Sequence, residues 1–218
     1  MKRFQFLTWL TCASLLLSGC KTGKSSASDN EDQETGRDVS AAIIGGKAGA
    51  AIGRRMQAQK EALEAAFPAD DATIETVNRG EALKLTFGAA SLFEANSNTL
   101  TQMGRLDLHR LAIHLNSNPD VCVKIVGYTD NTGRSAFNRI LSTRRAKSVC
   151  DLLTAKGVDA TRATYEGKGM RHPAASNRTA KGRTVNRRIE IFITPGEEMI
   201  REARQEKKQF KDSGTQKK

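Results

Sequence analysis

Aromatic residues, histidines and cysteines are all scarce in this chain of 218 residues: 5% of the residues are aromatic, three are His and four are Cys. The shortage of aromatic residues argues against nucleic-acid binding, because no platform for stacking unpaired bases is evident. The histidines, His109, His114 and His172, lack the spacing of metal ligands, and neither a GxSxG elbow nor a catalytic cysteine signature is present. We therefore predict a protein that is not an enzyme and that uses no metal and no cofactor.

Two of the four cysteines, Cys122 and Cys150, lie in strongly patterned segments. Cys122 alternates along a predicted strand with Val123, and therefore lies on the opposite face of the sheet from it. Cys150 has helical spacing with Val149 and Leu153 on a stripe that we expect to face the core. Because residues on opposite faces of a sheet rarely meet, the sequence favours two unpaired cysteines over a disulfide.

Negative charge is in deficit, with 24 Asp and Glu against 35 Lys and Arg, which gives a formal net charge of +11. A basic balance favours an anionic partner, and nucleic acid, acidic lipid and a carboxylate-bearing polymer all remain open on charge alone.

Long hydrophobic runs are also missing, and the longest, residues 4–17, is too short to span a bilayer. It follows Lys2 and Arg3 and precedes small residues, which predicts a signal peptide over residues 1–19. The stretch LSGC resembles a bacterial lipobox, which implies that Cys20 becomes the first mature residue and carries lipid, palmitate included. An ordinary signal peptide with an incidental cysteine is the alternative. Lys21 in place of Asp implies, by resemblance to enterobacterial lipoproteins, delivery to the outer membrane with the rest of the chain in the periplasm.

The segments after Cys20 differ sharply in composition. Residues 20–40 contain almost nothing to bury and are expected to form a flexible linker. Residues 41–67 are rich in Gly and Ala, and the four-residue spacing within them resembles a glycine zipper, whose members here are Gly45, Gly49 and Gly53. A helix that self-associates or inserts into a membrane and a plain flexible spacer both remain open.

A folded domain is predicted over residues 73–195. Two strands that form a hairpin are expected on either side of Arg79-Gly80. Further strands are expected at residues 121–126, 163–167 and 185–194, and helices at residues 100–115 and 135–156. This order predicts an α+β fold with a βαβαββ mixed sheet and helices packed on one face. Residues 196–218 are interpreted as a charged, solvated tail.

Four motifs occur in a fixed order: LF at residue 92, GYTDNTG, N…LS..RA, and GR..NRR. Together they resemble the OmpA-like domain of peptidoglycan-associated lipoproteins and outer-membrane proteins, over about residues 80–194. Tyr128 departs from the pattern, where the family usually has His, and Glu94 stands where Asp is common. The resemblance implies non-covalent binding of peptidoglycan through the meso-diaminopimelate of its stem peptide. It implies the following ligand-binding residues: Asp130, Arg145, Asn138, Asn96, Thr129 and Arg187.

The residues themselves support such a site. Asp130 follows Gly127 at the end of a strand, where its carboxylate can accept hydrogen bonds from an ammonium group. Asn138 and Arg145 are two helical turns apart, so both project from one face about 10.5 Å apart. An amino acid end with a free ammonium and a free carboxylate fits Asp130 and Arg145 together, whereas a structural ion pair of Asp130 with Arg145 or Arg187 is the alternative interpretation.

These observations predict a lipoprotein that tethers the outer membrane to the cell wall, with peptidoglycan and membrane lipid as partners and other envelope proteins as further candidates. A stator-like wall anchor and an exported protein that binds nucleic acid or another acidic polymer are the alternatives. Export removes most access to nucleic acid, so we expect no nucleic-acid partner.

Overall fold

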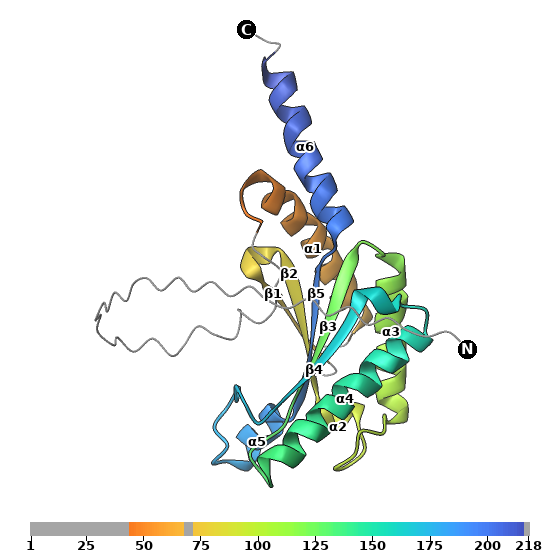
Figure 1. The fold of residues 1–218 in the computed structure, drawn as a ribbon, viewed down its shortest axis with the longest axis vertical. Coiled ribbons are helices and arrows are strands. Elements are labelled where there is room, and N and C mark those ends of the chain that lie inside the picture. Colours follow the sequence, from red (N-terminus) through yellow and green to blue (C-terminus); the bar gives the residue numbers. More distant parts are fainter. Residues whose placement is uncertain (1–43, 68–71, 216–218) are drawn as a thin grey trace, which may run out of the picture. The chain divides into compact units, whose positions relative to one another are not determined.

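In a computed structural model, the structure describes residues 44–67 and 72–215. A single five-stranded mixed sheet has the strand order β1-β2-β5-β3-β4, and helices α3 and α4 lie along it (Figure 1). The elements, in chain order, are α1 (Gly46–Ala66), β1 (Thr73–Val77), the 3₁₀ turn η2 (Asn78–Gly80), β2 (Ala82–Gly88), α2 (Ala89–Leu92), α3 (Gln102–Ser117), β3 (Val121–Tyr128), α4 (Ser135–Ala155), η3 (Ala160–Arg162), β4 (Ala163–Gly169), α5 (Ala180–Asn186), β5 (Arg188–Pro195) and α6 (Glu197–Thr215).

The α+β fold class and the βαβαββ order are confirmed for the run from β2 to β5. Strands β3 and β4 pair in parallel, as the intervening helix α4 requires, and the other neighbours pair antiparallel. The predicted hairpin is also present: β1 and β2 are joined through Arg79 and Gly80, whose φ angles are 58° and 87°.

Alternation along the strands separates two faces of the sheet. One face carries the aliphatic residues of β2, β3 and β5, which form the main core with α1, α3 and α4, as in the run Ile189, Ile191 and Ile193. The opposite face holds a small second cluster of Val126, Tyr128 and Phe192. The sheet therefore has its helices on one face, as the sequence predicts.

Helix α4 packs closely on the sheet because two strand residues lack side chains. A Cβ atom on Gly127 of β3 would lie 2.3 Å from the Ser142 carbonyl oxygen, and one on Gly167 of β4 would lie 2.3 Å from the Thr143 nitrogen. The backbone N–H of Gly169 donates to Ser142 Oγ at 2.9 Å. This close approach fixes α4 over the carboxyl end of β3.

The packed unit extends beyond residues 73–195 at both ends. On α1, Ile52, Met56 and Leu63 are fully buried in the main core, and on α6 Met199 is fully buried. Helix α6 is therefore packed against the domain at its start, and its first turns are not the solvated tail expected from their charge.

Two details go beyond or differ from the sequence prediction. On α3, Leu108, Leu111 and Leu115 are fully buried, whereas Met103 and Leu106 are 56% and 46% exposed. The last strand begins at Arg188, since the residues before it form α5.

Cys122 and Cys150 are both unpaired, as the sequence favours. Within the described residues, no helix combines the length and hydropathy that a bilayer crossing requires. The predicted signal peptide, Cys20, the linker over residues 20–40 and the first residues of the Gly-rich segment lie outside the described part of the chain.

Candidate functional site

A cavity of about 420 Å³ lies at the carboxyl end of β3, between the loop after that strand, α4 and α5. All six residues that the sequence singles out line this cavity: Asn96, Thr129, Asp130, Asn138, Arg145 and Arg187. They come from four separate segments of the chain. The remaining lining residues are Thr132, Gly133, Phe137, Leu141 and Arg183.

Asp130 is the only carboxylate among the residues that line the cavity, and it is 7% exposed. Its Oδ1 accepts a hydrogen bond from the Thr132 backbone N–H at 2.9 Å, and its Oδ2 accepts one from Arg187 Nη1 at 2.6 Å. Burial alone would raise the pKa of Asp130, but the Thr132 and Arg187 hydrogen bonds outweigh it and hold the pKa below its usual value. The group is therefore a carboxylate at neutral pH, and each oxygen retains a lone pair for a further donor.

The sequence allowed an ion pair of Asp130 with either Arg145 or Arg187. The structure contains the pair with Arg187. Arg145 is held differently: its Nε donates to the Ser97 carbonyl oxygen at 2.7 Å, and its guanidinium carbon lies 5.2 Å from the centre of the Phe93 ring. Burial, followed by the charge of Arg187, lowers the pKa of Arg145, but a guanidinium remains protonated at neutral pH. Its terminal nitrogens are left to face the cavity.

Asn138 and Thr129 have different parts in the site. The Asn138 amide donates to the carbonyl oxygens of Thr132, at 2.9 Å, and Asp130, at 3.4 Å, so it holds the TDNTG loop in place. Thr129 Oγ1 is buried and has no hydrogen-bond partner within the described part of the chain. A buried hydroxyl without a partner costs free energy, so Thr129 is available to a ligand.

Asn96 and Arg187 lie at the edges of the cavity. Asn96 is exposed and has a φ of 53° at the tip of a loop whose base is closed by pairing of Phe93 with Leu100. Because Arg145 binds Ser97 in the same loop, the guanidinium also positions Asn96. Arg187 follows the last residue of α5, and its second terminal nitrogen donates to Thr184 Oγ1 at 2.9 Å.

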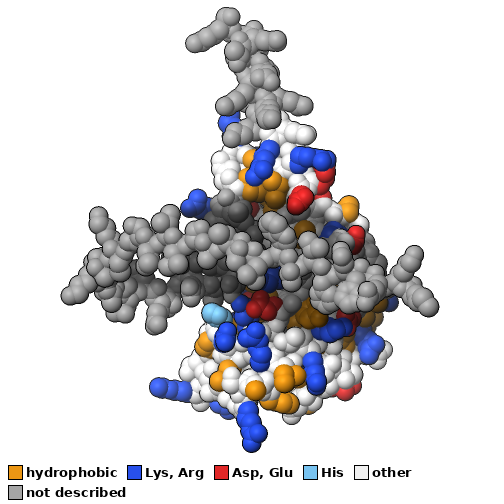
Figure 2. Space-filling model, in the orientation of Figure 1, with side chains coloured by type: hydrophobic (Ala, Val, Ile, Leu, Met, Phe, Trp, Pro, Cys, Tyr) orange, Lys and Arg blue, Asp and Glu red, His pale blue; other side chains and the backbone are white. Residues whose placement is uncertain are grey.

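Arg183 and Phe137 also line the cavity but are not among the six residues that the sequence singles out. Arg183 reaches the cavity from α5, and its place in the GR..NRR motif was the available signal. Phe137 lies on the first turn of α4 next to Asn138 and is 58% exposed; its exposure is evident only in the structure. In Figure 2, hydrophobic side chains lie among Lys and Arg at the lower end, where α4 and α5 lie in Figure 1.

The arrangement suits a ligand with both charges. Three guanidinium groups, those of Arg145, Arg183 and Arg187, surround a single carboxylate, that of Asp130. The excess of positive charge favours a carboxylate on the ligand, and Asp130 adds an acceptor for an ammonium group. No group of residues with the composition of a metal site occurs in the described chain.

Comparison with known proteins agrees with this geometry. Residues 92–187 match the model of the OmpA family. Over 220 aligned residues, the chain is 32% identical to the probable lipoprotein YiaD of Escherichia coli strain K12, and the match covers 89% of this chain and 99% of YiaD. The chain belongs to the OmpA family.

Other relatives of this OmpA-family chain are similar over the domain alone. The peptidoglycan-binding protein ArfA of Mycobacterium tuberculosis strain H37Rv is 48% identical over 86 residues, which cover 39% of this chain and 26% of ArfA. Among solved structures, the cell wall anchor of the T6SS from Pseudomonas aeruginosa is 30% identical with a TM-score of 0.53, and the match covers 65% of this chain and 95% of that one. ArfA is named for peptidoglycan binding and the Pseudomonas protein for anchoring to the cell wall. Membership of the OmpA family identifies the chain as a binding protein and not an enzyme.

Tyr128, which departs from the family pattern, does not line the cavity. Its ring lies 3.8 Å from the Arg188 guanidinium carbon on the opposite face of the sheet. Burial, with a smaller effect from Glu190, raises the pKa of Tyr128 and keeps its hydroxyl protonated. The substitution therefore changes packing behind the loop and leaves the lining of the cavity unaltered.

Proposed function

We propose that the protein binds peptidoglycan non-covalently by holding the free amino acid end of meso-diaminopimelate in the cavity beside Asp130 and Arg145. One observation carries the proposal: a buried carboxylate and a buried guanidinium, each with unused hydrogen-bonding capacity, line the same 420 Å³ cavity. The relatives support it, since ArfA is named for peptidoglycan binding and the Pseudomonas protein for anchoring to the cell wall.

Each charged end of the ligand has a receptor in the cavity. The ligand ammonium donates to the remaining lone pairs of Asp130 and to Thr129 Oγ1, which has no partner in the described chain. The ligand carboxylate accepts from the terminal nitrogens of Arg145, a charge-assisted contact that contributes about 1.5–3 kcal/mol. Arg183 and Arg187 add positive charge behind that contact, and Leu141 with Phe137 provides apolar walls for the hydrocarbon part.

The same proposal assigns a mechanical role to the whole chain. Residues 1–19 are a signal peptide, Cys20 carries the lipid, and residues 20–40 link it to the packed unit that begins at α1. Several acyl chains anchor stably where a single chain does not, since each buried methylene contributes about 0.8 kcal/mol. The protein then connects the outer membrane to the wall without making or breaking a bond.

Co-sedimentation of the full chain in detergent with isolated sacculi tests the proposal. We expect Asp130→Asn and Arg145→Ala each to lower binding by at least about tenfold, since each removes a charged contact. Arg144→Ala is the matched control, because Arg144 is exposed on the same helix and does not line the cavity. Unchanged binding by both cavity variants, with folding shown by circular dichroism, would contradict the proposal.

A further inference from the structure

Strands β3 and β5 carry a contact on the face of the sheet that lies behind the cavity. The two strands pair antiparallel as far as Gly127 and Ile189, and the next two residues, Tyr128 and Arg188, meet on the face opposite the main core. The guanidinium carbon of Arg188 lies 3.8 Å from the centre of the Tyr128 ring. This distance is that of a cation–π contact, so the two side chains form a stack.

Arg188 is buried and is held at three further points. Its Nε donates to Glu190 Oε1 at 2.7 Å, and Glu190 is buried as well. Its terminal nitrogens donate to the carbonyl oxygens of Asn186, at 3.5 Å, and His172, at 3.2 Å. His172 lies in the loop between β4 and α5, so this one side chain connects that loop to the end of β3 and the start of β5.

The ion pair of Arg188 with Glu190 is a poor means of stabilising the fold. The attraction between the two groups is offset by the cost of removing both charges from water, and apolar residues of similar size often stabilise a fold equally well or better. A better-attested role of a buried polar group is to fix one arrangement of the chain. The contacts of Arg188 fix the start of β5 against the end of β3.

The cavity residues are close neighbours of this stack along the chain. Arg187 directly precedes Arg188, and Thr129 alone separates Asp130 from Tyr128. Arg187 Nη1 donates to Asp130 Oδ2 at 2.6 Å within the cavity. Because at most one residue separates each member of the stack from a member of this ion pair, a movement within the stack also moves the ion pair.

We propose that Arg188 is a positioning residue of the binding site, and that its stack on Tyr128 keeps the carboxylate of Asp130 at the place where a ligand meets it. Arg188 does not itself line the cavity. This role rests on the proposed function, since it concerns the geometry of the site that holds the wall ligand. Loss of the stack would leave the charges of the cavity lining unchanged and alter their placement.

The pKa of Asp130 reports this placement without any ligand. Burial raises this pKa, but hydrogen bonds from Thr132 and Arg187 outweigh it and hold the pKa below its usual value. Arg188→Lys keeps a cation beside Glu190 but has no planar group to stack, so we expect the pKa of Asp130 to rise. Carboxyl ¹³C shifts of the full chain in detergent, followed from about pH 7.5 to about pH 4, measure the change. The wild-type carboxyl should remain ionised over this range, whereas that of the variant should begin to protonate.

Variants at Tyr128 and Ile52 complete this measurement. Tyr128→Leu removes the ring and should also raise the pKa of Asp130, whereas Tyr128→Phe keeps the ring and should restore the wild-type titration. Ile52 is fully buried on α1, which does not line the cavity, so Ile52→Val should lower stability and leave the pKa of Asp130 unchanged. An unchanged pKa in either Arg188→Lys or Tyr128→Leu, or an equal rise in Ile52→Val, would overturn the proposal.

Co-sedimentation with sacculi connects the placement of Asp130 to binding. We expect Arg188→Lys and Tyr128→Leu each to weaken binding by about tenfold, and the double variant to weaken it no further, because both changes remove the same stack. Circular dichroism shows whether each variant is folded. If Asp130→Asn loses binding while the stack variants bind like the wild type, the positioning role is wrong. Wild-type binding by Asp130→Asn would instead contradict the proposed function, so the two failures are distinguishable.

Discussion

Arg145 combines two tasks in one side chain. Its Nε and the Phe93 ring fix the guanidinium against the loop that carries Asn96, and its terminal nitrogens remain for a ligand. A lysine at this position keeps the charge but has neither the planar fork nor the Nε donor. The residue type, and not only its charge, is therefore required for the arrangement of the cavity.

Arg145→Lys should consequently behave like a loss of function. We expect affinity for sacculi to fall by about tenfold or more, because both the contact with Ser97 and the bidentate grip on a carboxylate disappear. Co-sedimentation across a concentration series measures the change. Arg139→Lys is the control, since Arg139 is exposed on α4 and outside the cavity lining. Wild-type affinity in Arg145→Lys would show that charge alone suffices.

His114 gives the stability of the protein a dependence on pH. Burial lowers its pKa in the folded state, so below pH 6.5 the unfolded chain binds the proton more readily than the folded chain does. The free energy of unfolding is therefore highest above the pKa that His114 has in the unfolded chain. It decreases as the pH falls from that value toward the pKa of His114 in the folded chain. The loss is at most about 1.4 kcal/mol per pH unit.

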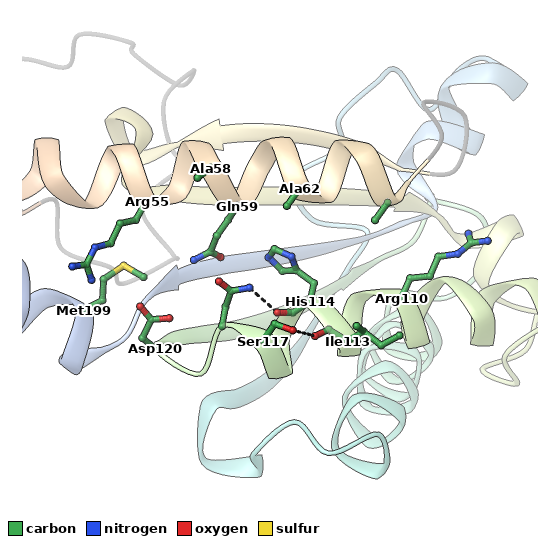
Figure 3. A pocket seen from close by; sticks show the side chains of 12 residues that line it. Arg55, Ala58, Gln59, Ala62, Arg110, Ile113, His114, Ser117, Asp120 and Met199 are labelled. Atoms are coloured by element: carbon green, nitrogen blue, oxygen red, sulfur yellow. Dashed lines mark hydrogen bonds between the residues drawn. The ribbon is translucent and has the colours of Figure 1, made fainter.

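Urea unfolding at pH 7.5 and at pH 5.5 checks this dependence. The wild type should lose more free energy of unfolding between the two conditions than His114→Gln, which has no group to protonate there. Arg55, Arg110 and Asp120 line the same cavity between α1 and α3 as His114 (Figure 3) and are unchanged in both proteins, so the difference isolates the imidazole. Identical losses in the two proteins would contradict burial as the cause.

Among the elements, α4 determines the site because it packs on two glycines of the sheet. Its turns around Ser142 lie where a Cβ on Gly127 would collide, and Asn138 and Arg145 project from either side of that contact. The position of the helix is thus set by absent side chains on the neighbouring strands.

Gly127→Ala should therefore destabilise the fold and displace the site at the same time. The new methyl group would approach a backbone oxygen to 2.3 Å, which forces α4 outward at a cost of about 1–3 kcal/mol. Chemical denaturation measures the first effect and co-sedimentation with sacculi the second. At Gly88 an added Cβ meets its nearest atom at 4.0 Å, so Gly88→Ala is the matched control. A variant as stable as the control would refute the close packing.

Helix α1 is joined to the sheet by a specific contact at its first residues. Glu81, which is 5% exposed, accepts hydrogen bonds from the backbone N–H groups of Ile44, at 2.6 Å, and Gly45, at 2.8 Å. A Cβ on Gly49 would lie 2.2 Å from Glu81 Oε1. This glycine, one of the three in the zipper-like pattern, therefore serves packing within the chain.

Glu81→Gln should weaken this attachment. It replaces one acceptor by an N–H₂ donor that faces a backbone N–H, and we expect a loss of about 1–3 kcal/mol in the free energy of unfolding. Glu75→Gln removes a 52% exposed partner of Lys84 and should change stability by no more than about 1 kcal/mol. Equal losses in the free energy of unfolding for the two variants would show that Glu81 does not attach α1 to the sheet.

The sequence predicted elements better than it predicted their contacts. The motif order was sufficient to place six residues around one cavity, and the strand and helix periods gave most boundaries within a few residues. Arg183 lies in the GR..NRR motif, but the motif alone does not show that its side chain reaches the cavity. The packing of Gly49 was missed because it depends on Glu81, which is 32 positions further along the chain. Contacts of that kind form only when segments that are distant in the sequence meet in the fold, so the local periodicity of the sequence does not predict them.

At the scale of the whole molecule, Arg145, Arg183 and Arg187 surround Asp130 at the carboxyl end of β3. Helix α1 and the first turns of α6 are buried in the same core as the sheet. No residue of α1 lines the cavity, so the proposed wall ligand is held by elements other than the one that follows the proposed membrane anchor in the chain.

Recognition of an ammonium and a carboxylate on one carbon is tested most directly by titration of the full chain with three compounds. Meso-diaminopimelate has both groups, pimelate lacks the amines, and 1,5-diaminopentane lacks the carboxylates. Followed by NMR at Thr129, Asp130 and Arg145, diaminopimelate alone should produce saturable shifts, and Asp130→Asn should abolish them. Equal shifts with pimelate, or none with diaminopimelate, would contradict the account.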